Sequence, residues 1–149
     1  MRVLALDLGS KRIGVAVSDA DERVAIPITT LERIADKSRL YAQIQQLVED
    51  WEAELVLLGL PIDLEGKTGI AASAVIAERE QLAKRLKVPV ELHDERMTTR
   101  IAERSLRERG DLDAKARRKV IDAVAASVIL QDWMDARRNA GSVGEDLSE

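Results

Sequence analysis

Residues 3–18 read VLALDLGSKRIGVAVS, two apolar runs joined by a short polar turn. We expect Val3–Leu8 and Ile13–Ser18 to form strands, and their close spacing predicts antiparallel neighbours. A third run, Arg23–Leu31, follows after another short turn and extends the meander. Pro27 lies within this run and lacks a backbone N–H, so we expect the third strand at an edge of the sheet.

Beyond these strands, the hydrophobic pattern alternates between helices and strands. Helical spacing or capping signals predict four helices: Lys37–Trp51, Ile70–Leu86, Thr98–Arg109 and one from Asp111 or Asp113 to about Arg138. Two further strands are expected over Glu54–Leu60 and Val88–His93. Because αβ crossovers return parallel, the order predicts an α/β fold with a five-stranded mixed sheet, three antiparallel strands followed by two parallel ones, and helices on both faces.

The composition limits the class of protein. The chain has 149 residues, of which 46% are hydrophobic, enough for one domain with an aliphatic core. We expect this domain to span residues 1–139, with the Gly-, Ser- and acid-rich residues 140–149 as a disordered tail. The chain has no cysteine and one histidine, His93, which excludes disulfide scaffolds, cysteine-rich zinc sites and thiol nucleophiles.

No membrane segment or secretion signal is expected. No stretch approaches the roughly 18 consecutive apolar residues of a membrane-spanning helix. Asp7 also interrupts the N-terminal apolar run too early for a signal peptide. The sequence therefore favours a cytoplasmic protein without membrane contact.

Acidic residues stand at three places where an unpaired charge is costly. Asp7 lies within the first apolar run, and Asp122 lies in VIDAVAASVIL, a helical segment that is apolar nearly all round. Asp94 and Glu95 follow the fifth strand, and only one of two adjacent residues can face a site there. Each place has a structural alternative: turn capping for Asp7, a helix N-terminus for Asp94 and an ion pair with Arg118 for Asp122.

Three such carboxylates from distant elements predict one cluster. With no cysteine and a single histidine in the chain, any metal ion in this cluster would be held by oxygen. Oxygen-only sites select Mg²⁺ or Mn²⁺, and two such ions can clamp the attacking and leaving oxygens of a phosphoryl displacement. The carboxylates therefore favour metal-dependent phosphoryl chemistry.

Positive charge is concentrated in one part of a chain whose net charge is −4. Residues 96–119 contain nine basic and four acidic residues. Arg100 and Arg104 lie at helical spacing and, with Arg96, predict a surface for a nucleic-acid backbone. A solvated helix face explains this stripe about as well.

The first turn offers a second basic position. Lys11 and Arg12 lie next to the predicted carboxylate cluster and are placed to hold a phosphate. The alternative is that both are ordinary solvated turn residues. His93 has no clear functional signal, since a lone strand histidine is more often structural.

The sequence resembles the YqgF family in four ordered motifs. Residues 7–19, DLGSKRIGVAVSD, resemble that family's opening signature, and residues 59–61, GLP, with Gly66 resemble its second motif. Residues 94–99, DERMTT, resemble the third motif, and residues 121–126, IDAVAA, resemble the fourth. The likeness covers about residues 1–138.

This resemblance implies a ribonuclease-H-like fold whose third strand lies at an edge. The family is described as Holliday-junction resolvases and as nucleases that mature the 5′ end of pre-16S ribosomal RNA. By this likeness Asp7, Glu95 and Asp122 are the catalytic, metal-binding acids, with Mg²⁺ or Mn²⁺ as cofactor.

The sequence departs from the wider ribonuclease-H and resolvase pattern at two places. Those enzymes usually carry an acid at the end of the fourth strand, where this chain reads GLP and has no acid until Asp63. Glu95 would have to substitute. A fourth acid close to Asp122 is also missing, because Asp132 is ten residues on, about 15 Å along a helix. The number of metal ions therefore stays open.

Several functions fit these features. The leading hypothesis is a metal-dependent nuclease acting on ribosomal RNA precursor, with nucleic-acid contacts from Lys11, Arg12, Arg96, Arg100 and Arg104. A resolvase of four-way DNA junctions needs paired active sites, so a dimer would favour it; we expect a monomer or a weak homodimer. A non-catalytic RNA-binding ribosome-assembly factor is a further alternative. An actin-like sugar kinase or ATPase normally needs two such domains, and this chain supplies one.

Overall fold

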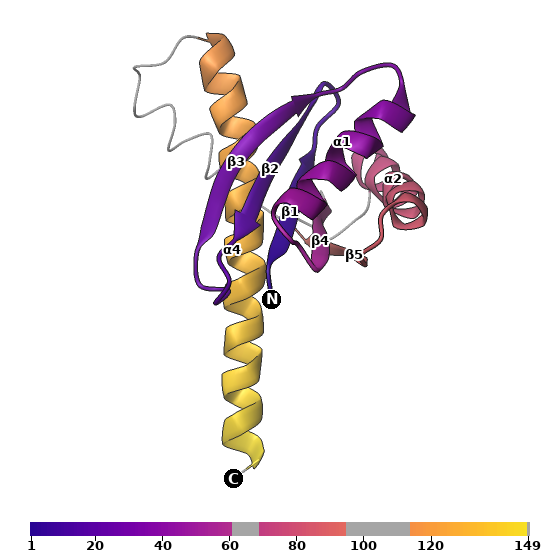
Figure 1. Cartoon of the computed structure of the whole chain (residues 1–149). Coiled ribbons are helices and arrows are strands. Elements are labelled where there is room, and N and C mark those ends of the chain that lie inside the picture. Colours follow the sequence, from indigo (N-terminus) through magenta and orange to yellow (C-terminus); the bar gives the residue numbers. More distant parts are fainter. Residues whose placement is uncertain (61–68, 95–113, 149) are drawn as a thin grey trace.

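The computed structural model describes residues 1–60, 69–94 and 114–148, which form one sheet and the helices around it (Figure 1). The elements in chain order are β1 (Val3–Leu8), β2 (Arg12–Ser18), β3 (Ala25–Glu32), α1 (Lys37–Asp50), β4 (Leu55–Leu60), α2 (Ile70–Arg85), β5 (Val90–Asp94) and α4 (Ala114–Ser148). The helix expected over Thr98–Arg109, and the expected caps Asp111 and Asp113, lie outside the described residues.

The five strands form a single mixed sheet in the order β3-β2-β1-β4-β5. β1 pairs antiparallel with β2, and β2 pairs antiparallel with β3. β1, β4 and β5 run parallel to one another. The predicted sheet is therefore confirmed, and β3, which contains Pro27, is at an edge as expected.

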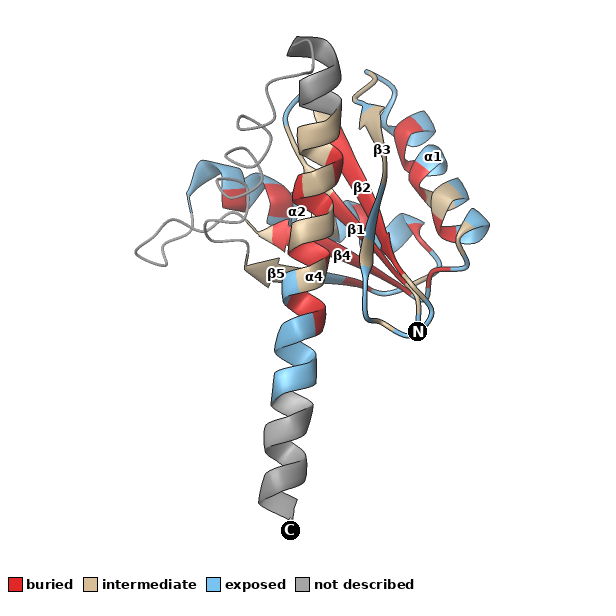
Figure 2. Cartoon of the chain, turned by 90° about the vertical axis from the view of Figure 1, so that its left-hand side faces the viewer, coloured by how far each residue is buried: buried red, intermediate tan, exposed pale blue. Residues whose placement is uncertain are grey.

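Alternation along the strands separates two hydrophobic cores. Leu4 and Leu6 of β1 point to one face, where they pack with α1 and α2 through residues such as Ile44 and Leu82. Val3 and Ala5 point to the other face, where their neighbours include Ile129 and Leu130 of α4. Figure 2 shows α4 crossing this second face of the sheet. Helices therefore cover both faces, as the hydrophobic pattern predicted.

Among the described elements before α4, the strand and helix boundaries lie within two residues of the sequence prediction. β3 begins two residues late because Asp19 extends the preceding turn, its carboxylate accepting hydrogen bonds from the backbone N–H groups of Arg23 and Val24. β5 begins at Val90 because Pro89 has no N–H to donate to the sheet. Local turn chemistry thus sets both differences.

α4 departs most from the prediction. The sequence predicted an end near Arg138 and a disordered tail from Ala140, whereas α4 continues to Ser148. Gly141 and Gly144 each cost about 1 kcal/mol inside a helix relative to alanine. Extending a helix that has already formed is far easier than starting one, so two glycines do not end it. The domain boundary at residue 139 stays a prediction.

Among the described residues, none of the helices combines the length with the apolar character that crossing a bilayer requires.

Candidate active site

Asp7 lies near the C-terminal end of β1, on the face covered by α4. Its side chain has the same parity as Val3 and Ala5, which belong to the α4 core. The residue is half-buried, whereas the four residues from Val3 to Leu6 are fully buried. The strand thus carries a carboxyl group to the rim of an otherwise apolar face.

Gly14 brings α4 against this carboxyl group. It pairs with Asp7 across the β1–β2 ladder. A Cβ atom at Gly14 would lie 1.8 Å from the backbone oxygen of Asp122 and 2.3 Å from its carbonyl carbon. The backbone of α4 therefore rests directly on β2 at this residue, which places Asp122 beside Asp7.

Burial and charge both act on Asp7. Desolvation, followed by the negative charge of Asp122, raises the pKa of Asp7 to about 6. The two carboxyl groups are therefore close enough to repel each other. Two of the three predicted catalytic acids are brought together by the fold.

Arg12 supplies the positive charge at this place. Its Nε atom donates to Oδ2 of Asp122 over 2.7 Å, and the side chains of Arg12 and Asp122 are 22% and 21% exposed. From the sequence, Arg118 was the suggested structural partner of Asp122, and a phosphate was the suggested partner of Arg12. In the structure, Arg12 and Asp122 pair with each other. The ion pair joins residues 110 positions apart, so sequence spacing alone gave no signal for it.

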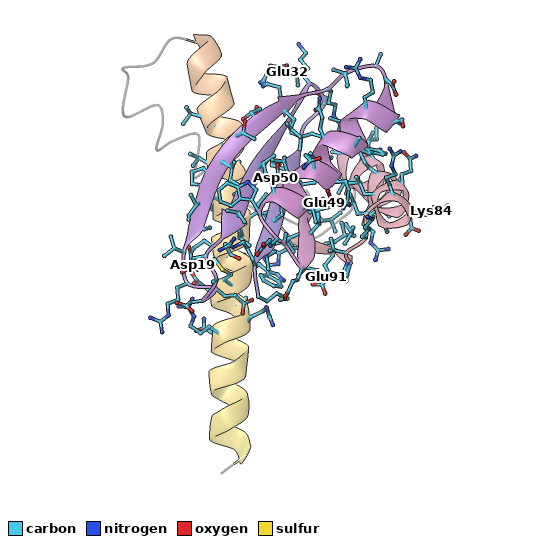
Figure 3. The ribbon with its side chains drawn as sticks, viewed as in Figure 1. Asp19, Glu32, Glu49, Asp50, Lys84 and Glu91 are labelled. Atoms are coloured by element: carbon cyan, nitrogen blue, oxygen red, sulfur yellow. The ribbon has the colours of Figure 1, made fainter. Side chains whose placement is uncertain are left out.

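The turn between β1 and β2 is short and tightly closed. The N–H of Gly9 donates to the carbonyl oxygens of Asp7 (3.1 Å) and Arg12 (3.0 Å). Ser10 and Lys11 are exposed at the tip. Figure 3 labels Glu32, which lies opposite Arg12 in the β2–β3 strand register at this end of the sheet. It also labels Asp19, which lies at the opposite end of β2. Lys11 is therefore open to solvent, directly before Arg12 in the turn.

The end of β5 lies on the far side of β4 from β1. Asp94 is its last residue and pairs with Leu60. Asp94 has the parity of Val90 and Leu92, which pack toward α1 and α2, so its position in the strand is on the face opposite Asp7. Glu95, Arg96, Arg100 and Arg104 lie outside the described residues.

A second polar contact links β5 to α4. The Nε2 atom of His93 lies 2.7 Å from Oδ2 of Asp132. The sequence analysis favoured a structural role for His93. In the structure, the contact connects β5 to α4, the helix that carries Asp122. No pattern in the sequence indicated the pairing, because the two residues are 39 positions apart.

Within residues 1–60, 69–94 and 120–139, whose side chains the structure describes, no group of three or more His, Cys, Asp or Glu residues is arranged to hold a metal ion. Asp7 and Asp122 form a pair of oxygen donors. Hard divalent ions such as Mg²⁺ prefer such oxygen ligands, and a cation between two repelling carboxylates would relieve the repulsion. The chemistry of the pair fits Mg²⁺ or Mn²⁺, with a further ligand needed from elsewhere.

Comparison with known protein families gives a match over nearly the whole chain. The model of the family RuvX, described as Holliday junction resolvase, matches residues 1–136. A protein of Chloroflexus aurantiacus (strain J-10-fl) named "Putative pre-16S rRNA nuclease" is 46% identical over 145 residues, which are 97% of this chain and 94% of that protein. A protein of Caldanaerobacter subterraneus with the same name is 42% identical over 140 residues, 94% of this chain and 100% of its own length.

Solved structures with the same fold include two of RuvC from Thermus thermophilus. One is a complex with a Holliday junction substrate, with a TM-score of 0.56, 18% identity and coverage of 93% of this chain and 96% of that chain. The other has a TM-score of 0.53, 14% identity and coverage of 93% and 97%. The fold is therefore the RuvC-like ribonuclease-H fold, as the sequence motifs had implied.

Proposed function

This chain belongs to the RuvX family, and from that membership we propose that it is a metal-dependent nuclease that processes the 5′ end of pre-16S ribosomal RNA. The observation that carries the proposal is the meeting of Asp7 and Asp122 across the β2–α4 contact at Gly14. A pair of carboxylates at the rim of the sheet, with one guanidinium against it, is suited to binding a cation next to a phosphate.

We propose Asp7, Asp122 and Glu95 as the catalytic residues and as the ligands of Mg²⁺ or Mn²⁺. The alternation along β5 supports Glu95 over Asp94, because the parity of Asp94 directs it away from the face of Asp7. The chemistry that a bound ion supplies is the activation of water and the neutralisation of charge on the scissile phosphate. Asp7, with its raised pKa, gives up its proton more readily when such a cation is bound.

Basic residues would orient the nucleic acid. Arg12 already holds one oxygen of Asp122 and keeps a positive charge at the site. Lys11 is exposed at the tip of the same turn and is the nearest candidate for a phosphate contact. Arg96, Arg100 and Arg104 would extend the contact along the strand, by their charge rather than by base stacking.

The relatives' names favour RNA as the substrate, and the cytoplasm, where ribosomes assemble, is the compartment we propose. A second candidate, cleavage of four-way DNA junctions, is supported by the description of the RuvX family and by the RuvC complex of the same fold. That activity needs two active sites, so it requires a dimer, whereas trimming of an RNA end does not. A non-catalytic assembly factor would bind the same RNA without turnover.

A side-by-side cleavage assay separates these candidates. The substrates are an RNA with the pre-16S 5′ leader and a four-way DNA junction, each with Mg²⁺ or Mn²⁺. The proteins are the wild type, Asp7→Asn and the matched control Asp50→Asn, which changes an aspartate on α1, labelled in Figure 3, that accepts from Gln46 Nε2. We expect the wild type and the control to cut the RNA, and Asp7→Asn to cut neither substrate.

The other outcomes point elsewhere. Symmetric cleavage of the junction with no cleavage of the RNA would replace the proposal with a resolvase. RNA binding without cleavage in all three proteins would replace it with an assembly factor. Cleavage by Asp7→Asn at the wild-type rate would remove Asp7 from the site.

A further inference from the structure

Arg33 holds the β1–β2 turn from outside the carboxyl site. Its backbone N–H donates to the carbonyl oxygen of Lys11 over 2.9 Å. Its Nε atom donates to the carbonyl oxygen of Gly9 over 2.6 Å. These two carbonyl groups flank Ser10, so Arg33 binds the tip of the turn through two hydrogen bonds.

The remaining nitrogens of Arg33 are fixed by α2 and, through it, by α1. The Nη1 and Nη2 atoms donate to the carboxylate of Glu78 over 3.0 and 2.6 Å. The hydroxyl of Tyr41 donates to Glu78 over 3.0 Å. We call this set of three residues, Arg33, Glu78 and Tyr41, the Arg33 clamp. The clamp connects α1 and α2 to the β1–β2 turn. Only a planar guanidinium can bridge a carbonyl and a carboxylate in this way.

The clamp keeps its charges at neutral pH. Burial alone would raise the pKa of Glu78, but the hydrogen bond and charge of Arg33 outweigh burial and hold that pKa below its usual value. The hydrogen bond to Glu78 raises the pKa of Arg33. Burial, followed by the hydrogen bond to Glu78, raises the pKa of Tyr41 to about 12. Near neutral pH, Arg33 and Glu78 therefore stay charged and Tyr41 stays protonated, so the hydrogen bonds of the clamp do not change with pH there.

Among the described residues, a cavity rather than packed side chains lies behind the turn. A cavity of about 490 Å³ lies between the turn and α2, lined by Gly9 and Ser10 on one side and by Ala71 and Ala74 on the other. Arg33 and Glu78 also line this cavity. In the part of the chain that the structure describes, the turn is therefore held on this side by the hydrogen bonds of Arg33.

We propose that Arg33, with Glu78 and Tyr41 behind it, is a positioning residue for the active site. The expected effect on cleavage rests on the proposed nuclease function, whereas the expected effect on the order of the β1–β2 turn does not. Asp7 precedes the turn and Arg12 ends it, so a loosened turn shifts both groups relative to Asp122 on α4. A shift of about 1 Å in a reacting group can cost up to about 100-fold in rate.

The test compares Arg33→Lys with Arg79→Lys in the full chain. Arg79 is a matched control on α2: its Nε also donates to a backbone carbonyl, that of Val90, over 3.0 Å, and it also pairs with a glutamate, Glu80. The first measurement is amide hydrogen exchange by NMR, which needs no substrate. We expect Arg33→Lys to accelerate exchange at Gly9 by about tenfold or more and to leave Leu57 in β4 unchanged. Arg79→Lys should change neither amide.

The second measurement is cleavage of the pre-16S leader RNA. We expect Arg33→Lys to lower kcat by about 10-fold to 100-fold and to change KM by less than about twofold. Should Arg33→Lys fail to fold, Tyr41→Phe removes only one hydroxyl from the clamp and should give a smaller change of the same kind. Unchanged exchange at Gly9 in a folded clamp variant would overturn the proposal, as would equal losses of kcat in Arg33→Lys and Arg79→Lys. If the wild type cuts no RNA, the nuclease function fails while the exchange result still tests the clamp.

Discussion

Asp7 carries an energetic cost at neutral pH. Its pKa is raised from 3.8 to about 6 in the folded chain, so between these values the folded state holds a proton that the unfolded state has lost. Stability therefore falls as the pH rises through this window and is constant above it. The shift corresponds to roughly 1 to 3 kcal/mol once partial exposure is allowed for.

We expect Asp7→Asn to stabilise the protein while removing its activity. At about pH 7.5 its free energy of unfolding, measured in urea, should exceed that of the wild type by roughly 1 to 3 kcal/mol. At about pH 3 or below the difference should disappear, because Asp7 is then largely protonated in both the folded and the unfolded wild type. Asp50→Asn should show no such pH-dependent gain. A wild-type stability that rises between about pH 4 and pH 6 relative to Asp7→Asn would contradict this account.

The Arg12–Asp122 pair can be weighed by a double-mutant cycle. Both side chains are about four-fifths buried, so removing one leaves the other poorly solvated. We expect the coupling energy from Arg12→Gln, Asp122→Asn and the double variant to be about 1 to 3 kcal/mol. The control is the Arg137–Glu22 pair, at 2.8 Å and with side chains 50% and 31% exposed, which should couple by less than about 1 kcal/mol. Equal coupling in the two pairs would contradict the importance of burial.

At this scale the sequence predicted some of the site but not its contacts. Asp7 and Asp122 could be found because a charge within an apolar strand or helix is costly and demands an explanation. The Arg12–Asp122 pair and the Arg33 clamp could not, since they join residues 110 and 45 positions apart and depend on how α4 and α2 pack on the sheet. Glu95 stays a prediction.

Gly14 shows how one element positions another. The approach of α4 to β2 leaves no space for a side chain at Gly14, where a Cβ atom would lie 1.8 Å from the backbone of Asp122. Backbone cannot rotate away as a side chain can, so α4 must move or the residue must be glycine. The opening motif therefore contributes to the site through a missing side chain as well as through Asp7.

We expect Gly14→Ala to destabilise the protein by about 3 kcal/mol or more and to abolish cleavage. The matched control is Gly69→Ala, at the N-terminus of α2, where an added Cβ atom would meet nothing within 4 Å. That change should cost less than about 1 kcal/mol and leave cleavage intact. Thermal unfolding and the RNA assay measure both effects. A stable, active Gly14→Ala protein would show that α4 does not need this contact.

At the scale of elements, hydrophobic periodicity was sufficient for most of the fold. The short apolar run of β1 and the continuous apolar run of β4 predicted strands whose bounds are nearly those observed. The pattern could not predict how far α4 extends, because its last residues have no apolar stripe to show where a helix ends. Its length is a property of helix propagation, which leaves little trace in hydrophobic spacing.

The whole molecule presents its acidic site on one face of the sheet. Asp7 and Asp122 both lie on the α4 side, while α1 and α2 cover the other side. If this pair is the nuclease site, as we propose, a nucleic-acid strand reaches it from the side of α4. The net charge of −4 opposes this approach, and residues 20–95 contain fifteen acidic and nine basic residues. We therefore propose that affinity for nucleic acid comes from the basic part of the chain, residues 96–119.

This asymmetry predicts a change in the salt dependence of RNA binding. Each phosphate contact to a single strand contributes about 0.7 to the slope of log K against log salt concentration. If Arg100 and Arg104 both contact phosphates, Arg100→Gln/Arg104→Gln should lower the slope by about 1.4 and weaken binding uniformly across RNA sequences.

Binding is measured by fluorescence anisotropy in an Asp7→Asn background, which prevents cleavage. The control is Arg137→Gln/Arg138→Gln on α4, two arginines that bind Glu22 and should leave the slope unchanged. A reduced slope in the control alone would move the RNA contact to the C-terminal half of α4, away from the carboxyl pair, and would separate binding from the proposed site.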